Sequence, residues 1–373
     1  MSEVRMLNLI DSSFLGGPEK YILGYAKRTR GSVKIAVATF ESGGRERSQF
    51  SQALALGMVQ SLSILCANSY DPRQLTRLIA LVKKEGFNVI NSHGYRANLI
   101  GLIASRILRI PIVATFHGWT GSDSKVRVFD RIDRAVLRMM DHIITVSEAN
   151  KGLLKHLGIK GSAITVVPNA IDPEQLVSSF QANQAMVLRQ ALRFGEAERV
   201  CICVGRLSPE KGQEVALKAF AGVTREIPEC RLVFLGDGPD EPKLRMISQE
   251  LGIQDFVRFV GFQANVVDYM SLSEVIILPS HTEGLPTVVL EAFLCSSFVI
   301  ATSVGGTPEV VRDQETGLLV PPNDCDSLCK AIIWSLRNEK ERKRMADNAY
   351  RFVMANCTFE EHAAKLVAVL DTL

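Results

Sequence analysis

The sequence has few of the features that would place the protein in a membrane, outside the cell or around a metal ion. No apolar run reaches the ~18 residues of a candidate transmembrane helix. The N-terminus, MSEVRMLNLIDSS, lacks the basic start and long apolar stretch of a signal peptide. Eight cysteines are scattered, without a C-x-x-C pair or a cluster with histidine, so neither a disulfide framework nor a zinc site is indicated. We expect a cytoplasmic protein with reduced thiols.

Tandem repeats and low-complexity segments are also absent, and the chain is long and uneven in charge. At 373 residues it exceeds what one hydrophobic core usually supports, so two domains are the default. The net charge is only +3, but residues 1–172 carry 23 basic and 13 acidic side chains, a net +10, whereas the remainder carries 20 and 27, a net −7. A basic first half favours anionic partners, although a chance imbalance on a solvated surface gives the same count.

Short β-branched runs alternate with segments of helical period from end to end. Their separation by roughly 15–30 residues predicts βαβ units and parallel sheets, and their apolar character on both faces predicts helices on each side of the sheet. The fold class is therefore α/β, with two Rossmann-like parallel-sheet domains. The predicted strands are 4–10, 33–40, 59–65, 88–93, 111–118, 142–147, 163–169, 199–205, 230–236, 256–262, 274–280, 297–303 and 316–322.

A pause in this alternation sets the predicted domain boundaries. Residues 1–172 form the first domain, 173–198 a linker or hinge region, and 199–355 the second domain. The tail, residues 356–373, has an amphipathic helical pattern and is expected to pack on a domain surface. Ligands of parallel α/β sheets bind beyond the carboxyl ends of the strands, so the informative residues should follow strands.

Glycines and histidines follow strands in the first half. Gly16 and Gly17 precede a helical pattern with proline at an early position. Such a loop lets backbone N–H groups approach a phosphate or a sugar, although a plain strand-to-helix turn has the same composition. His117 follows the fifth run, in TFHGW, and His93 ends the fourth, in NSHGY. A histidine there can contact a ligand hydroxyl, stabilise charge, or merely cap a loop.

Two cations follow the first strand of the second half, in VGRLSPEKG. Arg206 and Lys211 converge on a strand-to-helix loop, where they could stabilise the charge that develops on a departing diphosphate. An ordinary solvated loop is the alternative. Further on, LGDGP and FVGF put glycines and main-chain groups, with Gly261 and Phe262, where a nucleotide base could stack or form hydrogen bonds.

Two carboxylates bracket a turn and a helix start in HTEGLPTVVLEA. Glu283 and Glu291 are eight residues apart, which is about 12 Å along a helix axis, so they suit two ends of one ligand better than a shared proton. The turn is Gly284-Leu285-Pro286, and a helix is expected from about Thr287. Its N-terminus is a candidate anion site.

The order of these motifs resembles the retaining glycosyltransferases of family 4, which have the GT-B fold. The motifs are the early GG, FHG, GRLSPEKG, LGDGP, FVGF, PSHTEGLPTVVLEA, SVGGTPEVV and TGLLVPP. The resemblance runs through essentially the whole chain and is densest from Val200 to Pro322. It implies two Rossmann-like domains facing a central cleft, with a C-terminal helix that crosses back to the first domain.

The resemblance also implies a role for each motif. Glu283 would contact the donor sugar and Glu291 the ribose, while Arg206 and Lys211 bind the donor diphosphate. The glycine loop would approach the phosphates from the first domain, with His117 near the sugar and the acceptor. The implied catalytic residues are His117, Arg206, Lys211 and Glu283, and the donor-binding residues are Gly16, Gly17, Arg206, Lys211, Gly261, Phe262, Glu283, Gly284, Leu285, Pro286, Thr287 and Glu291.

The implied reaction is transfer of a sugar from a UDP- or GDP-linked donor to an acceptor hydroxyl, with retention of configuration. In the front-face mechanism of such enzymes the departing phosphate helps to deprotonate the acceptor. We expect neither a metal ion nor a cofactor, because Arg206, Lys211 and the helix dipole would hold the diphosphate. A nucleic acid is not an expected partner.

The acceptor side would be the basic first domain. Residues 125–140 carry Lys125, Arg127, Arg131, Arg134 and Arg138 among apolar side chains. We expect this segment to dock on the inner face of an anionic membrane and the enzyme to receive a lipid-linked saccharide, as in cell-surface polysaccharide or glycolipid synthesis. In the alternative, these charges face water and pair with Asp130 and Asp133.

Two other functions fit the same architecture. A non-hydrolysing sugar-nucleotide epimerase would need acid and base groups around the sugar ring and no acceptor site. A nucleotide-sugar-binding module without catalysis would need only the donor contacts, but the presence of both glutamates and both cations disfavours it. NMR of the product separates transfer from epimerisation, and donor hydrolysis separates an enzyme from a binding module.

Overall fold

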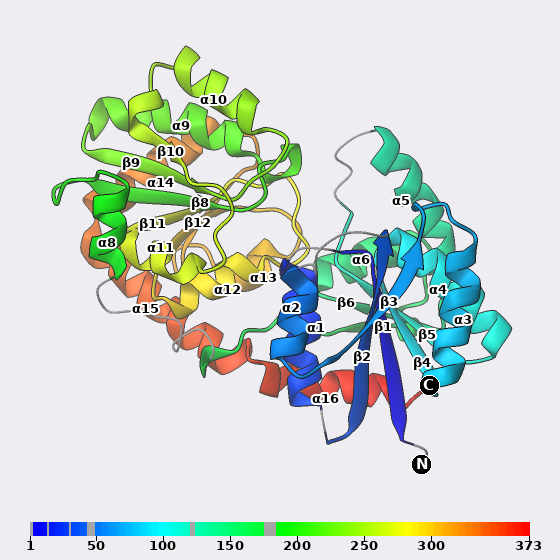
Figure 1. Cartoon of the computed structure of the whole chain (residues 1–373). Coiled ribbons are helices and arrows are strands. Elements are labelled where there is room, and N and C mark those ends of the chain that lie inside the picture. The colour runs from blue at the N-terminus through cyan, green and yellow to red at the C-terminus, as the bar shows by residue number, and fades with distance from the viewer. Residues whose placement is uncertain (1–2, 13–14, 30, 43–48, 120–123, 175–183) are drawn as a thin grey trace. The chain divides into compact units, whose positions relative to one another are not determined.

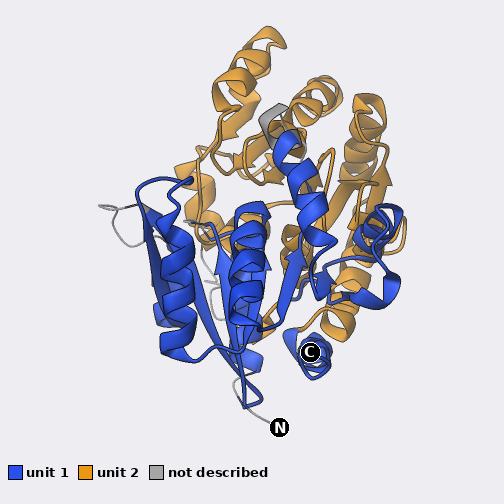
Figure 2. Ribbon diagram, turned by 90° about the vertical axis from the view of Figure 1, so that its right-hand side faces the viewer, with its two compact units in different colours: residues 1–170, 359–373 blue, residues 171–358 orange. Residues whose placement is uncertain are grey.

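Two parallel β-sheets organise the chain, each in its own unit. The computed structural model describes residues 3–12, 15–29, 31–42, 49–119, 124–174 and 184–373 (Figure 1). Unit 1 comprises Met1–Ala170 with Phe359–Leu373, and unit 2 comprises Ile171–Thr358 (Figure 2). The predicted α/β class, with two Rossmann-like parallel sheets, is confirmed.

The sheet of unit 1 has seven parallel strands in the order β3-β2-β1-β4-β5-β6-β7. They are β1 Val4–Ile10, β2 Val33–Ser42, β3 Gln60–Cys66, β4 Val89–His93, β5 Ile112–Phe116, β6 His142–Thr145 and β7 Ile164–Val166. The helices are α1 Gly17–Arg28, α2 Gln49–Leu56, α3 Arg73–Glu85, α4 Tyr95–Leu108, α5 Ser124–Leu137, α6 Glu148–His156 and α16 Phe359–Leu370, with the 3-10 turn η1 Gly161–Ala163. The order of strands reverses beside β1, between β1 and β4, which is where ligands bind in such sheets.

The sheet of unit 2 has six parallel strands in the order β10-β9-β8-β11-β12-β13. They are β8 Arg199–Val204, β9 Cys230–Leu235, β10 Val257–Phe259, β11 Val275–Leu278, β12 Phe298–Thr302 and β13 Leu318–Val320. The helices are α8 Gln184–Ala191, α9 Gln213–Glu226, α10 Glu241–Glu250, α11 Val266–Leu272, α12 Thr287–Leu294, α13 Thr307–Val310, α14 Cys325–Arg337 and α15 Glu339–Asn356, with the 3-10 turns η2 Pro209–Lys211 and η3 Gln254–Phe256.

Burial on both faces explains why these segments are strands. All four residues of β11 and all five of β12 are buried, as expected for parallel strands covered by helices on each side. β4 is equally buried although three of its five residues are polar, in VINSH. Those polar groups therefore need partners inside the protein, and they find them at the candidate site.

The C-terminal helix belongs to unit 1, as predicted. α16 packs against α1, and the Phe359 ring lies 5.1 Å from the Tyr25 ring at 88°. The same ring occupies the place of a side chain at Gly24, where a Cβ would lie 1.9 Å from it. Glu360 forms an ion pair with Arg28. The chain therefore returns to its first unit after completing the second.

The segment predicted as a linker contains one described helix. α8 packs against α11 of unit 2, and residues 175–183 lie outside the described part of the chain. None of the described helices is long and apolar enough to cross a membrane.

Candidate active site

Main-chain contacts hold together the loops that leave β8, β9 and β10 in unit 2. The Gly205 N–H donates to the Leu235 carbonyl at 2.9 Å, and the Gly236 N–H donates to the Gly261 carbonyl at 2.8 Å. A Cβ on Gly236 would lie 2.1 Å from the Gly205 carbonyl oxygen. Only glycine allows this approach, so the loop glycines of LGDGP serve packing between loops.

The loops that leave β11 and β12 meet in the same way. A Cβ on Gly305, which has a φ of +51°, would lie 1.8 Å from the Glu283 carbonyl oxygen, and the Gly306 N–H donates to the Gly284 carbonyl at 3.0 Å. A Cβ on Gly212, with a φ of +65°, would lie 2.1 Å from the Pro279 carbonyl oxygen. The motifs SPEKG, HTEGLP and SVGG therefore form one rigid surface at the carboxyl edge of the sheet.

Lys211 and Glu283 contact each other directly on this surface. The Lys211 Nζ lies 2.7 Å from the Glu283 Oε1, which also accepts a hydrogen bond from the Ser280 Oγ at 2.7 Å. The Glu283 side chain is only 8% exposed, against 28% for Lys211. Sequence reasoning gave these residues separate partners on the donor and did not consider Ser280. The ammonium has three donors, so the ion pair leaves capacity for a ligand anion.

Arg206 holds the neighbouring loop by its main chain and exposes its side chain. Its carbonyl accepts a hydrogen bond from the Nε2 of Gln213, a buried residue at the start of α9, at 2.8 Å. Its guanidinium is free to reach a ligand, since the residue is exposed at a strand exit. Gln213 was missed because glutamine at a helix start carries no distinctive pattern.

The remaining predicted donor contacts surround the start of α12. The helix begins at Thr287, as predicted, and Pro286 before it provides no side-chain cap. Leu285 is buried under the turn and Glu291 is buried on the helix. Phe262 is 42% exposed beyond β10, so its ring is available for stacking. The donor-binding roles of these residues stay predictions.

In unit 1 the glycine loop is closed by an acidic side chain. The Gly16 N–H donates to the Glu19 Oε2 at 2.8 Å, and α1 begins at Gly17. Glu19 is buried, and burial raises the pKa of its carboxyl. Gly16 and Gly17 thus lie at a helix start, as predicted, with one loop N–H already occupied.

His117 and His93 come together at the ends of β5 and β4. The His93 Nδ1 lies 3.1 Å from the His117 Nε2, with the rings stacked at 5.4 Å and 22°. Tyr21, a buried residue of α1, packs on both rings and crosses His117 at 87°. Sequence reasoning treated the two histidines separately, although their places at the exits of strands 24 residues apart were a usable signal.

Burial keeps this pair neutral. It lowers the pKa of His117 to about 4. Burial and the neighbouring His117 together hold the pKa of His93 well below its usual value. Both imidazoles are therefore uncharged at neutral pH and offer one donor and one acceptor each.

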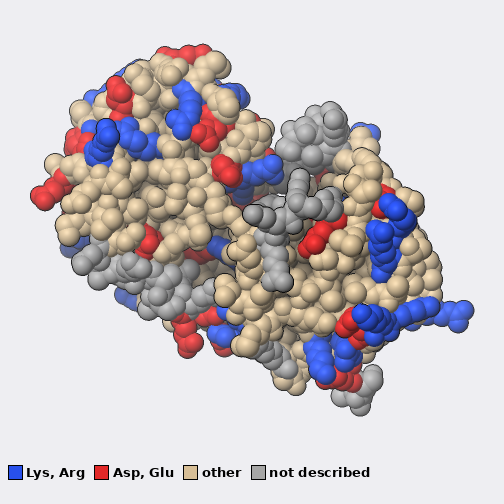
Figure 3. All heavy atoms as spheres, viewed as in Figure 1, with Lys and Arg blue, Asp and Glu red and all other residues tan. Residues whose placement is uncertain are grey.

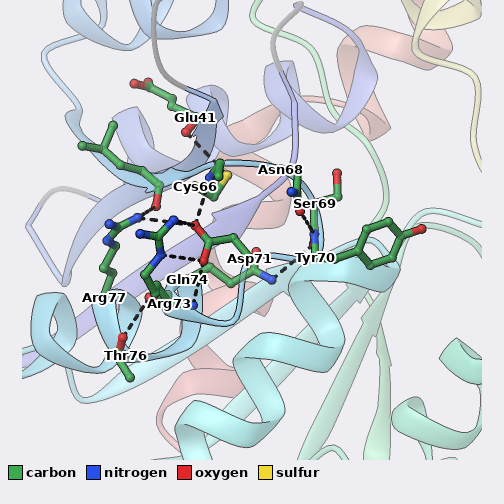
Figure 4. Close-up of polar contacts among 12 residues, drawn as sticks. Glu41, Cys66, Asn68, Ser69, Tyr70, Asp71, Arg73, Gln74, Thr76 and Arg77 are labelled. Atoms are coloured by element: carbon green, nitrogen blue, oxygen red, sulfur yellow. Dashed lines mark hydrogen bonds and ion pairs between the residues drawn. The ribbon is translucent and has the colours of Figure 1, made fainter.

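A second polar cluster in unit 1 is structural. Asp71, at the carboxyl end of β3, accepts hydrogen bonds from the main chain of Ala67 and from the guanidinium of Arg73 (Figure 4). These bonds, chiefly that from Arg73, hold the pKa of Asp71 well below its usual range. Arg77 donates to the Leu65 carbonyl, so the cluster fixes the turn into α3.

A D-x-D triplet could hold a metal-bound diphosphate, and one occurs in the second half, Asp324-Cys325-Asp326. Asp324 caps α14, accepting from the Ser327 N–H at 2.9 Å and from the Ser327 Oγ at 2.6 Å. Among the described residues, no three or more His, Cys, Asp or Glu side chains lie close enough together to hold a metal ion.

Two family models match this chain. One, Glycosyltransferase Family 4, matches residues 15–175, and the other, Glycosyl transferases group 1, matches residues 186–352. Each match covers most of one unit, and together they include every predicted site residue. The predicted resemblance therefore extends through both units.

Individual proteins agree with the family models. The alpha-D-kanosaminyltransferase of Streptomyces kanamyceticus is 34% identical over 260 residues, which are 66% of this chain and 67% of that protein. The UDP-Gal:alpha-D-GlcNAc-diphosphoundecaprenol alpha-1,3-galactosyltransferase of Escherichia coli is 25% identical over 272 residues, 70% of each chain. The crystal structure of Anabaena HepE in complex with UDP and glucose shares the fold, with a TM-score of 0.88 and 23% identity over 100% of both chains.

Proposed function

The chain belongs to glycosyltransferase family 4, and from this premise we propose that it transfers a sugar, with retention, from a UDP- or GDP-linked donor to a lipid-linked saccharide. Its activity as a glycosyltransferase and its use of a nucleotide-sugar donor follow from the family. The stereochemical course, the base, the acceptor and the residue roles are the proposal.

The Lys211–Glu283 ion pair beside the start of α12 carries the proposal. Lys211, exposed Arg206 and the N-terminus of α12 supply positive charge at one edge of one sheet, which suits a diphosphate. Glu283 holds the Lys211 ammonium in place and presents a carboxylate to the sugar hydroxyls. Glu291, buried one helical turn beyond the start of α12, is assigned to the ribose.

Catalysis in this proposal is stabilisation of the leaving group. As the bond from the sugar to the diphosphate lengthens, negative charge grows on the β-phosphate and is met by Arg206, Lys211 and the helix dipole. The phosphate oxygen that departs then accepts the proton of the acceptor hydroxyl, which attacks from the same face. Neutral His117 forms a hydrogen bond with a sugar or acceptor hydroxyl.

Two glutamate variants test the division of roles on the donor. A thermal-shift screen with UDP-glucose, UDP-galactose, UDP-N-acetylglucosamine and GDP-mannose identifies the donor, because a bound ligand raises the melting temperature. Glu291→Ala should weaken binding of the nucleoside diphosphate, whereas Glu283→Ala should mainly lower turnover. Equal binding of the free nucleoside diphosphate to both variants and to the wild type contradicts this division.

Product analysis tests the reaction itself. NMR of the product made from the donor and an undecaprenyl-diphosphate-linked sugar should show a new α-glycosidic bond. A changed sugar with no acceptor attached indicates epimerisation instead. No turnover of any donor, with binding intact, indicates a binding module.

An exposed apolar face on α4 and α5 supports the membrane-docking part of the proposal. Exposed residues recur every fourth position of α4, and α5 packs beside it. The exposed apolar side chains of this face are Tyr95, Leu99, Ile103, Ile107, Val128 and Ile132. Arg131 is exposed on α5 and Arg138 just beyond its end, and Figure 3 shows further Lys and Arg side chains on the α3 side of unit 1. Apolar anchors with basic neighbours suit an anionic bilayer.

The structure also bears on the alternative in which α5 pairs its own charges. Asp133 is buried and accepts hydrogen bonds from Asn98 at 2.7 Å and from Trp119 at 2.9 Å. Arg134 lies over the Trp119 ring, 4.9 Å from its centre. Asp133 thus has partners other than the basic residues of its own helix. The side chains of Lys125 and Arg127 lie outside the described residues.

Flotation with liposomes tests the docking surface. The wild type should float with vesicles containing an anionic lipid and much less with neutral vesicles. Leu99→Glu combined with Ile103→Glu should abolish flotation, whereas Met246→Glu, at an exposed apolar residue of unit 2, should not change it. Equal failure of the wild type with both vesicles contradicts membrane docking.

A further inference from the structure

The carboxyl ends of β1, β4 and β5 hold a chain of buried polar side chains that ends at His117. We propose that His93 is a positioning residue, which fixes the tautomer and the ring plane of His117. The turnover part of this inference rests on the proposed function, whereas the tautomer part does not.

This series of hydrogen-bonded side chains begins at Thr115 on β5 and continues through the neutral amides of Asn91 and Asn8. The Thr115 hydroxyl donates to the Asn91 Oδ1 at 2.8 Å, and the Asn91 Nδ2 donates to the Asn8 Oδ1 at 2.9 Å. The same Asn8 Oδ1 lies 3.0 Å from the His93 Nε2. All four residues are buried, so their hydrogen-bonding groups must be satisfied by one another.

These contacts select one protonation pattern. A carbonyl oxygen can only accept, so the His93 Nε2 must carry a proton and donate it to Asn8. In a neutral imidazole the His93 Nδ1 is then a lone pair, and it accepts the hydrogen that the His117 Nε2 must carry. The Asn91 Nδ2 and the His93 Nε2 lie 3.2 Å apart because both donate to the Asn8 Oδ1. If the His93 Nε2 were unprotonated, its lone pair would face a lone pair of the Asn8 Oδ1 at 3.0 Å.

The consequence reaches the free nitrogen of His117. With its Nε2 protonated, its Nδ1 is left as an acceptor, and the stacked His93 and the perpendicular Tyr21 ring limit rotation of the imidazole. An uncharged acceptor suits a hydroxyl group, which can donate to it, and repels a phosphate oxygen, which cannot. His117 is therefore set to recognise a sugar hydroxyl and not the diphosphate of the donor.

NMR of the intact chain with ¹⁵N-labelled histidine tests the tautomers directly. At pH 7.5 the wild type should show His93 and His117 both protonated at Nε2, with each Nδ1 bare. His93→Phe removes the acceptor and should shift His117 towards a mixture of tautomers, while His93→Asn, whose Oδ1 replaces the Nδ1, should keep the wild-type pattern. Protonation of His117 at Nδ1 in the wild type overturns the proposal, whatever the enzyme turns over.

Kinetics then separate positioning from folding. In hydrolysis of UDP-glucose, His93→Phe should lower kcat about 10- to 100-fold with little change in the KM for the donor, and His93→Asn should recover most of the rate. His142→Phe is the matched control, because His142 lies in the same sheet and bonds to Thr165 at 2.9 Å; it should leave kcat unchanged. If both His93 variants lose the rate equally with their melting temperatures intact, the hydrogen bond to His117 is not the cause. If the wild type does not hydrolyse UDP-glucose, the NMR measurement of the His117 tautomer still tests whether His93 positions His117.

Discussion

The carboxyl edges of the two sheets are built by different means. In unit 2 glycines bring main chains into contact, as at Gly236 and Gly305, and the charged groups Lys211 and Glu283 lie on that rigid surface. In unit 1 the ends of β1, β4 and β5 instead carry a network of neutral side chains that ends at His93 and His117. Main-chain N–H groups and cations suit an anion, while neutral amides and imidazoles suit hydroxyls. In the proposed function, the two units would accordingly recognise different parts of the reactants.

Removal of Lys211 should have the largest effect on catalysis, because it removes the Lys211–Glu283 ion pair from the carboxyl edge of the unit 2 sheet. Lys211→Ala removes a cation from the leaving group and leaves the Glu283 carboxylate with the hydrogen bond from the Ser280 hydroxyl. We expect kcat to fall about 100- to 1000-fold, as when a preorganised charge-stabilising donor is lost. Hydrolysis of the donor measures it. Lys218→Ala, which removes an exposed helical ion pair with Glu214, should change kcat less than twofold; similar losses in both variants would refute the assignment.

Substitution at Gly305 tests whether close contact between main chains contributes more to stability than the positive φ of the glycine. Gly305 and Gly252 both have positive φ, but nothing lies within 4 Å of a Cβ on Gly252. Gly252→Ala should cost about 1 kcal/mol from its φ alone, and Gly305→Ala about 2–4 kcal/mol because the Glu283 main chain must also move. Urea unfolding measures both. Donor binding should weaken only in Gly305→Ala, and equal behaviour of the two variants would show that contact is unimportant.

Acid should weaken the neutral edge specifically. Because the folded pKa of His117 is lowered to about 4, the unfolded chain binds more protons below pH 6.5, and stability falls as the pH drops from about 6.5 to 4. Because one pKa unit is 1.36 kcal/mol, lowering the pKa from 6.5 to about 4 corresponds to a loss of up to about 3 kcal/mol over this window.

A fluorescence measurement can assign this loss to unit 1. The two tryptophans are Trp119 and Trp334, so in Trp334→Phe the emission reports on unit 1 alone. Urea midpoints at pH 7.0 and pH 4.5 should differ in this background, and the difference should shrink when His117→Gln is added. If His117→Gln leaves the difference between the two urea midpoints unchanged, groups other than His117 cause the loss of stability in acid.

The strands and their order of use were predictable because parallel strands carry a strong signal. Each predicted run overlaps an observed strand, from Val4–Ile10 to Leu318–Val320, and only β2 and β3 extend past their predicted ends. Burial on both faces demands continuous apolar sequence, which is a strong signal. The start of α12 at Thr287 was predictable from the turn before it. In both cases the pattern is local to the chain.

Contacts between distant residues were not predictable in the same way. The Lys211–Glu283 pair spans 72 residues, so no local pattern encodes it. The His93–His117 pair, 24 residues apart, was indicated only by the places of the two residues at strand exits. The role of Gly305 depends on the main chain of Glu283, which the sequence cannot place. The sequence thus predicted candidate site residues at strand exits but not the partners that hold them.

The return of the chain to unit 1 has a consequence for synthesis on the ribosome. Unit 2 is one continuous segment whose ends lie side by side, with the Ile171 N–H donating to the Cys357 carbonyl at 2.8 Å. Unit 1 stays incomplete until Phe359–Leu370 has emerged, because that helix covers α1 through Gly24 and Tyr25. The half that emerges second can therefore finish folding first, while α1 waits, uncovered, for the last helix.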